Sequence, residues 1–346
     1  MKKILKIIIA LVVTHVSVGQ DYHFSQFFQH QLSLNPALTG RFKEDYRISM
    51  IHRNQWRGIN ASFVSTAAGG EINFKEGIFN RDKLGVGIYG YNDQLGEGII
   101  TNNAVFASVA YHHTLDHHKR HKLSGGAQLG YISKRINTDG FQFGNQYQFW
   151  TFNSSLPNFE ALENQNISYL DVQAGVYYSY MINELFHVEA GISAFDLTTP
   201  TESLQTIDSL ATNTLGSRWV ATIGADYKFD HFILYPKVLF VNQSGAGEVT
   251  PGILARYDFG STSIVGVYGG LFYRNKDAAI FMTGVHYKNI EIMGSYDMTT
   301  SGLADFEDAE GISRSGISGA YEISINILGI FNKSVPAQYT VPCGIF

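Results

Sequence analysis

The stretch Phe186-His187-Val188-Glu189-Ala190-Gly191-Ile192-Ser193 alternates between apolar residues and polar or small ones. Successive side chains of a β-strand point to opposite faces, so this pattern predicts a strand with one apolar face and one polar face. The same alternation recurs over residues 170–179, 219–228 and 317–326. Each segment has about the 9 to 11 residues that a tilted strand needs to cross a membrane.

Strands of this kind follow one another along almost the whole chain. We expect about 14 of them in a single antiparallel up-and-down transmembrane β-barrel, an all-β fold, with boundaries uncertain by two to four residues. An even number of strands places both ends of the barrel sequence on the same side of the membrane. The expected strands begin near Tyr46, Ser62, Lys83, Gly98, Arg120, Ser168, Leu185, Thr214, Phe232, Thr250, Ser261, Ala278, Ile290 and Gly311.

The connections between these strands differ in length by parity. Most even-numbered connections are tight, as at Asn183-Glu184, Asp230-His231, Gly260 and Lys288-Asn289. The three longest, roughly residues 137–167, 196–213 and 299–310, are odd-numbered. Short periplasmic turns and long outer loops are typical of outer-membrane barrels.

A soluble β-sandwich is the alternative fold, because alternating strands serve it equally well. The number and length of the strands and the scarcity of helical patterns argue against it, and a closed sheet alone satisfies backbone groups in lipid. The chain also carries 24 Phe, 20 Tyr and three Trp residues. Several aromatic residues gather near expected strand ends, as in a membrane-interface girdle: Tyr177, Tyr178, Tyr180, Tyr227, Phe229, Phe272 and Tyr273.

The composition and the N-terminal residues limit the class of protein to which the chain can belong. Residues 1–19 resemble a cleaved signal peptide, with Lys2, Lys3 and Lys6 before a short apolar run. The expected organisation continues with a periplasmic N-terminal segment over 20–45, the outer-membrane barrel over 46–328 and a periplasmic tail over 329–346. The single cysteine, Cys343, excludes an internal disulfide. A net charge of -5 argues against a nucleic-acid-binding protein, because such proteins carry an excess of positive charge.

Short motifs spread over the chain resemble those of a known family. They are Phe24-Ser25-Gln26-Phe27, Leu34-Asn35-Pro36-Ala37-Leu38-Thr39-Gly40, Arg53-Asn54-Gln55-Trp56, Leu84-Gly85-Val86-Gly87, Phe272-Tyr273-Arg274, Ser295-Tyr296-Asp297 and Tyr321-Glu322-Ile323-Ser324. In order and spacing they resemble the PorP/SprF family of outer-membrane proteins of the type IX secretion system. The end of the chain departs from the family pattern, since Pro342 precedes Cys343 where Cys-Pro is common.

This resemblance implies a location in the outer membrane of a member of the Bacteroidota. It implies a non-enzymatic component of the secretion and gliding machinery that needs no cofactor. Its role would be to assist the export or surface attachment of a large adhesin with a C-terminal sorting domain. The implied partners are outer-membrane lipid, that adhesin and other secretion components in the periplasm or outer membrane. The alternative is an outer-membrane diffusion channel or substrate-specific transporter.

Two groups of residues are candidates for function. Charged residues on the polar face would line the lumen, which we expect to be narrow or plugged: Asp171, Glu189, Asp226, Lys228, Lys237, Arg256 and Glu322. Aromatic and turn residues of the opening segment and the long loops could bind a partner protein, since aromatic anchors are common at interfaces: Phe24, Phe27, Phe28, Asn35, Pro36, Trp56, Trp150, Phe152 and Phe159. Those of the opening segment could equally fold into the barrel mouth.

Three weaker patterns point to chemistry. Residues 85–90 match G-x-G-x-x-G, but a dinucleotide site needs a helix there and the pattern continues as a strand. The histidine-rich run from His112 to His121 could hold a transition metal, yet such residues are ordinary at a solvated turn. His187 and Glu189 share an inward face, without a nucleophile that would specify an enzyme.

Overall fold

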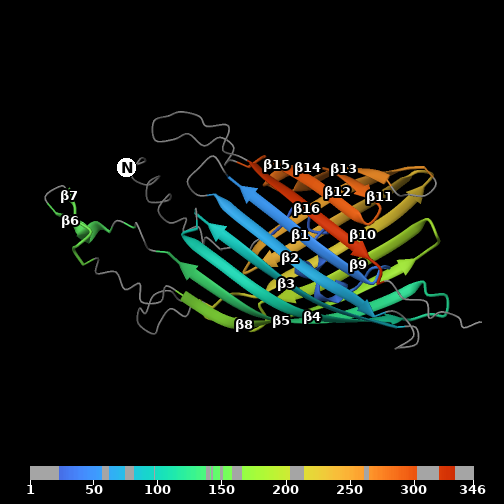
Figure 1. Ribbon diagram of the computed structural model, residues 1–346, viewed down its shortest axis with the longest axis horizontal. Coiled ribbons are helices and arrows are strands. Elements are labelled where there is room, and N and C mark those ends of the chain that lie inside the picture. The colour runs from blue at the N-terminus through green and yellow to red at the C-terminus, as the bar shows by residue number, and fades with distance from the viewer. Residues whose placement is uncertain are drawn as a thin grey trace, which may run out of the picture.

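A closed antiparallel barrel forms the body of the protein. The computed structural model describes residues 23–56, 62–74, 82–96, 98–137, 141, 143–148, 151–157, 166–202, 214–260, 265–301 and 319–331. Within these residues, each barrel strand pairs with the strands before and after it along the chain, and the last pairs with the first (Figure 1). The barrel has 14 strands, so the predicted fold and the predicted count are both confirmed.

The barrel strands are β1 (Tyr46–Gln55), β2 (Phe63–Phe74), β3 (Lys83–Leu95), β4 (Ile100–Thr114), β5 (His121–Ile136), β8 (Asn166–Met181), β9 (Phe186–Phe195), β10 (Arg218–Phe229), β11 (Phe232–Gln243), β12 (Ala246–Phe259), β13 (Val265–Arg274), β14 (Ala278–Tyr287), β15 (Ile290–Thr299) and β16 (Gly319–Gly329). A separate two-stranded hairpin joins β6 (Tyr147–Gln148) to β7 (Thr151–Phe152). Three short 3₁₀ helices complete the described elements: η1 (Gln31–Ser33), η2 (Pro36–Leu38) and η3 (Gly144–Gln146).

Most strands begin within two residues of the predicted position. β10 begins four residues later than expected, because Thr214 instead forms an isolated bridge with Thr201. β12 begins four residues earlier, since Ser244 and Gly245 have positive φ angles and make a tight turn from which pairing starts at once. The β6–β7 hairpin was not expected. The starts predicted near 261 and 311 lie outside the described residues.

Alternation sorts the side chains between lipid and lumen. On β10, Trp219 and Ile223 are half exposed on the outer face, whereas Val220 is buried on the inner one. Ile88, Leu129 and Leu170 show the same outward exposure on other strands. This band of exposed apolar side chains is the surface that contacts lipid. No helix in the described ranges is long and apolar enough to cross a membrane.

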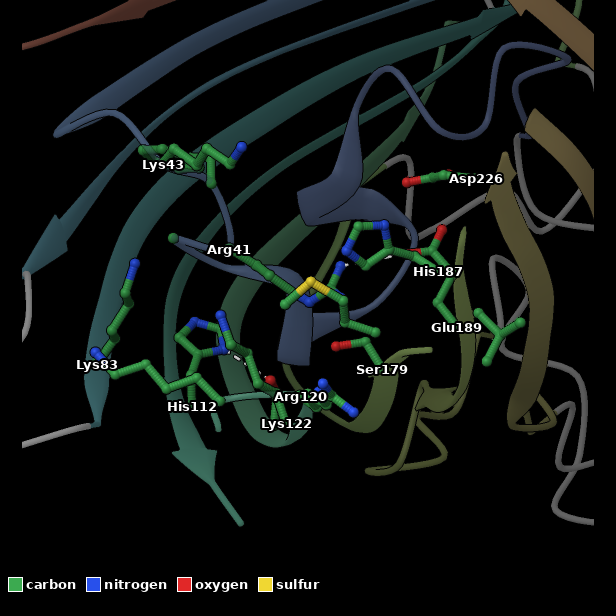
Figure 2. Close-up of a pocket in the computed structure, with 16 residues that line it drawn as sticks. Arg41, Lys43, Lys83, His112, Arg120, Lys122, Ser179, His187, Glu189 and Asp226 are labelled. Atoms are coloured by element: carbon green, nitrogen blue, oxygen red, sulfur yellow. Dashed lines mark hydrogen bonds and ion pairs between the residues drawn. The ribbon is translucent and has the colours of Figure 1, made fainter. Parts of the chain in front are cut away.

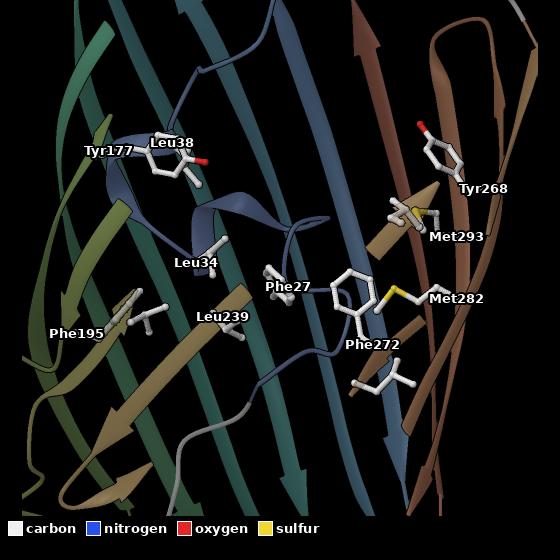
Figure 3. Close-up of a cluster of buried hydrophobic side chains, with 14 residues drawn as sticks. Phe27, Leu34, Leu38, Tyr177, Phe195, Leu239, Tyr268, Phe272, Met282 and Met293 are labelled. Carbon is white, nitrogen blue, oxygen red and sulfur yellow. The ribbon is translucent and has the colours of Figure 1, made fainter. Parts of the chain in front are cut away.

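The lumen has an apolar core of its own, which the alternation did not predict. Phe27, Leu34 and Leu38, all N-terminal to β1, pack against inward side chains of the wall, such as Leu239 and Phe272 (Figure 3). Two aromatic residues expected in the interface girdle, Tyr177 and Phe272, therefore lie inside the barrel. Tyr178, Tyr227, Phe229 and Tyr273 do face outward. The physical reason is that a filled lumen excludes water and gains from apolar burial.

The two ends of the barrel differ. We call the end where β1 begins and β16 ends the turn end, since the connections there include 230–231 and 288–289. The opposite, loop end carries the three long connections, which follow β5, β9 and β15. Because short turns face the periplasm in outer-membrane barrels, the turn end is the periplasmic end.

Candidate functional site

Residues 23–45, which we call the lumen segment, run through the inside of the barrel. Ser25 and Gln26 contact residues near the loop end, and Gly40 contacts Glu71 near the turn end. The segment therefore passes from the loop end to the turn end before it enters β1. The prediction of a periplasmic segment over 20–45 is wrong for this described part. The reason is that the segment buries apolar side chains against the barrel wall, and wall groups replace water as hydrogen-bond partners of its buried polar groups.

The start of the lumen segment is held by a buried group of charges, which we call the anchor cluster. The backbone N–H groups of Ser25 and Gln26 donate to the two carboxylate oxygens of Glu322, at 2.6 and 2.8 Å. The Ser25 hydroxyl donates to Asp297 Oδ2 at 2.5 Å. Ser324 Oγ donates in turn to the side-chain oxygen of Gln26 at 2.7 Å. The backbone N–H groups of both residues, the Ser25 hydroxyl and the Gln26 side-chain amide thus all find partners on the wall.

Two arginines balance the carboxylates of the anchor cluster. Arg53 Nη1 lies 2.5 Å from Glu322 Oε1 and 3.0 Å from Asp297 Oδ2, and Arg274 Nη1 lies 3.3 Å from Asp297 Oδ2. These four side chains are at most 4% exposed. Removing one partner from a buried ion pair costs about 3–5 kcal/mol, because the other charge is left unpaired in a poor solvent. The cluster therefore fixes the lumen segment strongly.

The middle of the lumen segment rests on glycines of the wall. Asn35 Oδ1 accepts from the N–H of Ala37 and so caps η2, with Pro36 at its first position. The Asn35 amide donates to the carbonyls of Val176 and Ile192. A Cβ at Gly175 would lie 2.0 Å from Asn35 Oδ1, and one at Gly126 would lie 2.4 Å from Pro36. Only bare backbone lets the segment approach so closely.

The end of the lumen segment carries a second set of ion pairs near the turn end. Arg47 Nη2 lies 2.6 Å from Glu71 Oε1, and the N–H of Gly40 donates to Glu71 Oε2 at 2.7 Å. Arg41 and Lys237 both bind Glu189, at 3.4 and 2.8 Å. Both ends of the segment are therefore pinned by charge, and its middle is held by close packing.

A carboxylate at the turn end has a shifted pKa. Asp82 precedes β3 and accepts from the Tyr111 hydroxyl at 2.5 Å and from the N–H of Thr114 at 2.9 Å, with His113 Nδ1 at 2.8 Å. Partial desolvation acts to raise the pKa of Asp82, but these hydrogen bonds outweigh it and lower the pKa to about 2. Asp82 thereby ties the start of β3 to the end of β4.

Side chains of the lumen segment and wall also surround a cavity of about 410 Å³ near the turn end. We call it the vestibule. Arg41 and Lys43 of the lumen segment face it together with Lys83 of β3 and Lys122 of β5 (Figure 2). Glu189 and Asp226 line it from β9 and β10. The vestibule is thus rich in cationic side chains.

The predicted lumen residues come from inward positions but serve different ends of the barrel. Asp171 is fully buried and accepts from Thr198 at 3.0 Å near the loop end. Arg256 pairs with its strand neighbour Asp258 at 2.5 Å. Lys228 is exposed. The structure brings Glu189 and Lys237 into one ion pair, places Asp226 in the vestibule and puts Glu322 in the anchor cluster.

The predicted partner-binding residues separate in the structure. Phe24, Phe27, Asn35 and Pro36 are buried inside the barrel and Phe28 is partly buried there, so they do not present a docking surface. Their enclosure follows from the glycine-lined and apolar wall. Trp56 stacks edge-on against Phe63 at the loop end, and Phe152 contacts Tyr147 in the β6–β7 hairpin. Trp150 and Phe159 lie outside the described residues.

The other sequence patterns have structural roles. The G-x-G-x-x-G match lies within β3, so no helix N-terminus is available for a dinucleotide, and Gly85 instead makes room for the Thr39 carbonyl. His112 Nε2 lies 2.8 Å from that same carbonyl inside the lumen, whereas His121 stacks on Tyr180 outside it. Among the described residues, no three His, Cys, Asp or Glu side chains are placed to bind a metal together.

Sequence reasoning missed several residues of the site. The motifs contain Arg53, Arg274 and Asp297 without indicating that these residues form ion pairs, and neither Arg47 nor Glu71 belongs to a motif or to the predicted lumen residues. The missing signal was parity: Arg47 and Arg53 occupy the same inward face of β1 as the buried Ser49 and Ile51. Four of the separate motifs, those with Arg53, Arg274, Asp297 and Glu322, meet the Ser25-Gln26 motif in one cluster.

Comparison with known proteins agrees with the family resemblance that these motifs carry. A family model described as type IX secretion system membrane protein PorP/SprF matches residues 16–325. The chain belongs to the PorP/SprF family. The resemblance read from the motifs is thereby confirmed, and so is the location in the outer membrane. Membership makes the chain a membrane component of the type IX secretion system. No curated protein sequence matches the chain.

Solved structures share the PorP/SprF chain's fold at low sequence identity. The CymD monoaromatic hydrocarbon channel superposes with a TM-score of 0.50 and 11% identity, over 91% of this chain and 96% of that one. A Pseudomonas aeruginosa FadL homologue gives a TM-score of 0.50 and 8% identity, over 85% and 92% of the two chains. Likeness at this level of identity concerns the barrel architecture alone.

Proposed function

We propose that this PorP/SprF chain is a non-enzymatic component of the type IX secretion and gliding machinery, which assists the export or surface attachment of a large adhesin with a C-terminal sorting domain. The observation that carries the proposal is the lumen segment. It occupies the barrel interior and is bound to the wall through the anchor cluster at one end and the Arg47–Glu71 pair at the other. A barrel whose lumen is filled in this way is better suited to hold a partner protein at the membrane, as a platform, than to act as an open pore.

Family membership connects the chain with the type IX secretion system. The loop end offers a surface to which the adhesin would bind. The three long connections all leave the barrel on the side that faces the cell exterior. Loops on a rigid scaffold are where binding surfaces are usually built. The adhesin would therefore bind at the loop end, while the anchored lumen keeps the outer membrane sealed.

The proposal is tested by deleting the gene and cataloguing surface proteins after brief protease treatment of intact cells. We expect the loss of one or a few large proteins with C-terminal sorting domains, restored by the wild-type gene. Total levels of those proteins in the cell should remain, which separates failed display from failed synthesis. Unchanged display in the deletion strain would contradict the proposal.

A channel or transporter is the second candidate, favoured by the fold shared with the CymD monoaromatic hydrocarbon channel and by the apolar side chains in the lumen. The two functions differ in a direct measurement. Purified protein in planar bilayers should give no steady conductance as a platform, and deletion should leave small-solute uptake unchanged. Conductance from the wild-type protein, together with reduced uptake in the deletion strain, would favour the channel.

A further inference from the structure

The vestibule concentrates positive charge in a protein that is negative overall. Six of the residues that line it are Lys or Arg and two are carboxylates, although the chain has a formal net charge of -5. The cationic residues are Arg41, Lys43, Lys83, Lys119, Arg120 and Lys122. One of the two carboxylates, Glu189, is already bound by Arg41 and Lys237. The side chains that line the cavity thus carry more formal positive charge than negative charge.

The charges are arranged asymmetrically around the cavity. Figure 2 shows Lys83, Lys122 and Arg120 on the side formed by β3 and β5, with Glu189 and Asp226 on the opposite side. His112 lies among the cations, where its Nε2 faces the Thr39 carbonyl at 2.8 Å. Cationic side chains thus gather on one side of the vestibule. Clefts lined by one sign of charge focus the field and attract ligands of the opposite sign.

The position of the vestibule limits what can reach it. Its lining comes from inward positions of strands, from the lumen segment and from Lys119 and Arg120 of the exposed turn between β4 and β5, so it opens at the mouth of the barrel. It lies at the turn end, where the periplasm has access. Its volume of about 410 Å³ falls within the range of specific ligand sites. A ligand from the periplasm with several negative charges fits these conditions.

We propose that the vestibule is a docking site for an acidic segment of a periplasmic protein. Asp and Glu side chains of such a segment would pair with Arg120 and Lys122, and arginine can hold a carboxylate through two parallel hydrogen bonds. An extended peptide can place carboxylates along the cationic side of the vestibule, which a single small anion cannot. The site lies at the opposite end of the barrel from the proposed adhesin contact, so it stands whether or not an adhesin is the cargo.

The test uses the full-length mature protein in lipid nanodiscs and a fluorescent ten-residue peptide rich in Asp and Glu. Fluorescence anisotropy should show saturable binding that weakens as salt rises from low to high ionic strength, because salt screens charge pairs. The same peptide with Asn and Gln in place of the acids should not bind. Inorganic phosphate is titrated separately as the small-anion probe.

Two matched variants decide where the peptide binds. The double variant R120Q/K122Q should weaken binding by about tenfold or more, since charged hydrogen bonds of this kind are the strong ones. The control K276Q/K288Q makes the same charge change at turns outside the vestibule. Heat-modifiable gel mobility establishes that each variant is folded. Retained binding in R120Q/K122Q, or an equal loss in K276Q/K288Q, would overturn the proposal.

Binding of phosphate alone and binding of the peptide to lipid alone are two further results that would rule out the proposal. If phosphate binds with the same dependence on Arg120 and Lys122 but the acidic peptide does not, the vestibule is a small-anion site and the proposal fails. If the peptide binds only to nanodiscs of one lipid composition, including empty ones, the lipid is the receptor and the proposal also fails. Peptide binding that needs the protein and its vestibule charges supports it.

Discussion

Replacement of Glu322 by Gln should loosen the lumen segment while leaving the barrel closed. The carboxylate accepts the N–H groups of Ser25 and Gln26 and pairs with Arg53 at 2.5 Å, with no exposed side-chain surface. Gln keeps one acceptor oxygen and nearly the same shape, but it removes the charge. Breaking a buried pair costs about 3–5 kcal/mol. We take about 3 kcal/mol, because Asp297 remains beside Arg53.

That free energy acts on the docking of the segment rather than on the sheet. The backbone pairing of β16 with β1 and β15 does not involve the Glu322 side chain. Since about 1.4 kcal/mol corresponds to a factor of ten, the open population of the segment should rise by roughly a hundredfold. Hydrogen exchange of the amides from Phe24 to Leu38, measured by mass spectrometry in nanodiscs, should accelerate accordingly.

The matched control is D230N, which makes the same change of charge on an 80% exposed side chain in the β10–β11 turn. We expect this variant to exchange like the wild type. Equal protection of residues 24–38 in E322Q, D230N and wild-type protein would refute the reasoning. So would faster exchange throughout the strands of E322Q, since that would mean the barrel itself had been weakened.

Three further predictions address packing, lipid contact and pH. G126A should destabilise the protein by about 1–3 kcal/mol through overpacking against Pro36, whereas G125A, whose Cβ would meet nothing within 4 Å, should be neutral in urea unfolding from vesicles. I88R should destabilise folding into vesicles by about 2–4 kcal/mol, because Ile88 is 58% exposed to lipid in the middle of β3; a neutral result there would contradict the placement of the lipid face. Because the folded pKa of Asp82 is lowered to about 2, its carboxylate should stabilise the protein above pH about 4, and this contribution should disappear as pH falls towards 2. D82N should abolish that acid sensitivity in thermal melts, and an unchanged pH profile would argue against it.

Much of the fold could be predicted from the sequence because it rests on local pattern. Alternation along Phe186–Ser193 and its relatives sets which side chains face lipid, and turn residues such as Asp230-His231 and Lys288-Asn289 set where strands reverse. Both depend on neighbours in the chain. The same logic placed Glu189 and Glu322 inside the barrel, although it could not say that one binds Lys237 and the other binds Ser25.

By itself the sequence determined the closed sheet of 14 strands, its outward apolar face and its family, since each of these depends on periodicity or on short motifs. Tertiary structure alone decided that the opening segment lies inside the barrel. That placement depends on contacts between residues nearly 300 positions apart, such as Ser25 with Glu322, and on glycines such as Gly126 whose lack of a side chain has meaning only opposite Pro36. The vestibule arises in the same way, because charges on four strands, on the turn between β4 and β5 and on the lumen segment meet around one cavity only when the sheet closes.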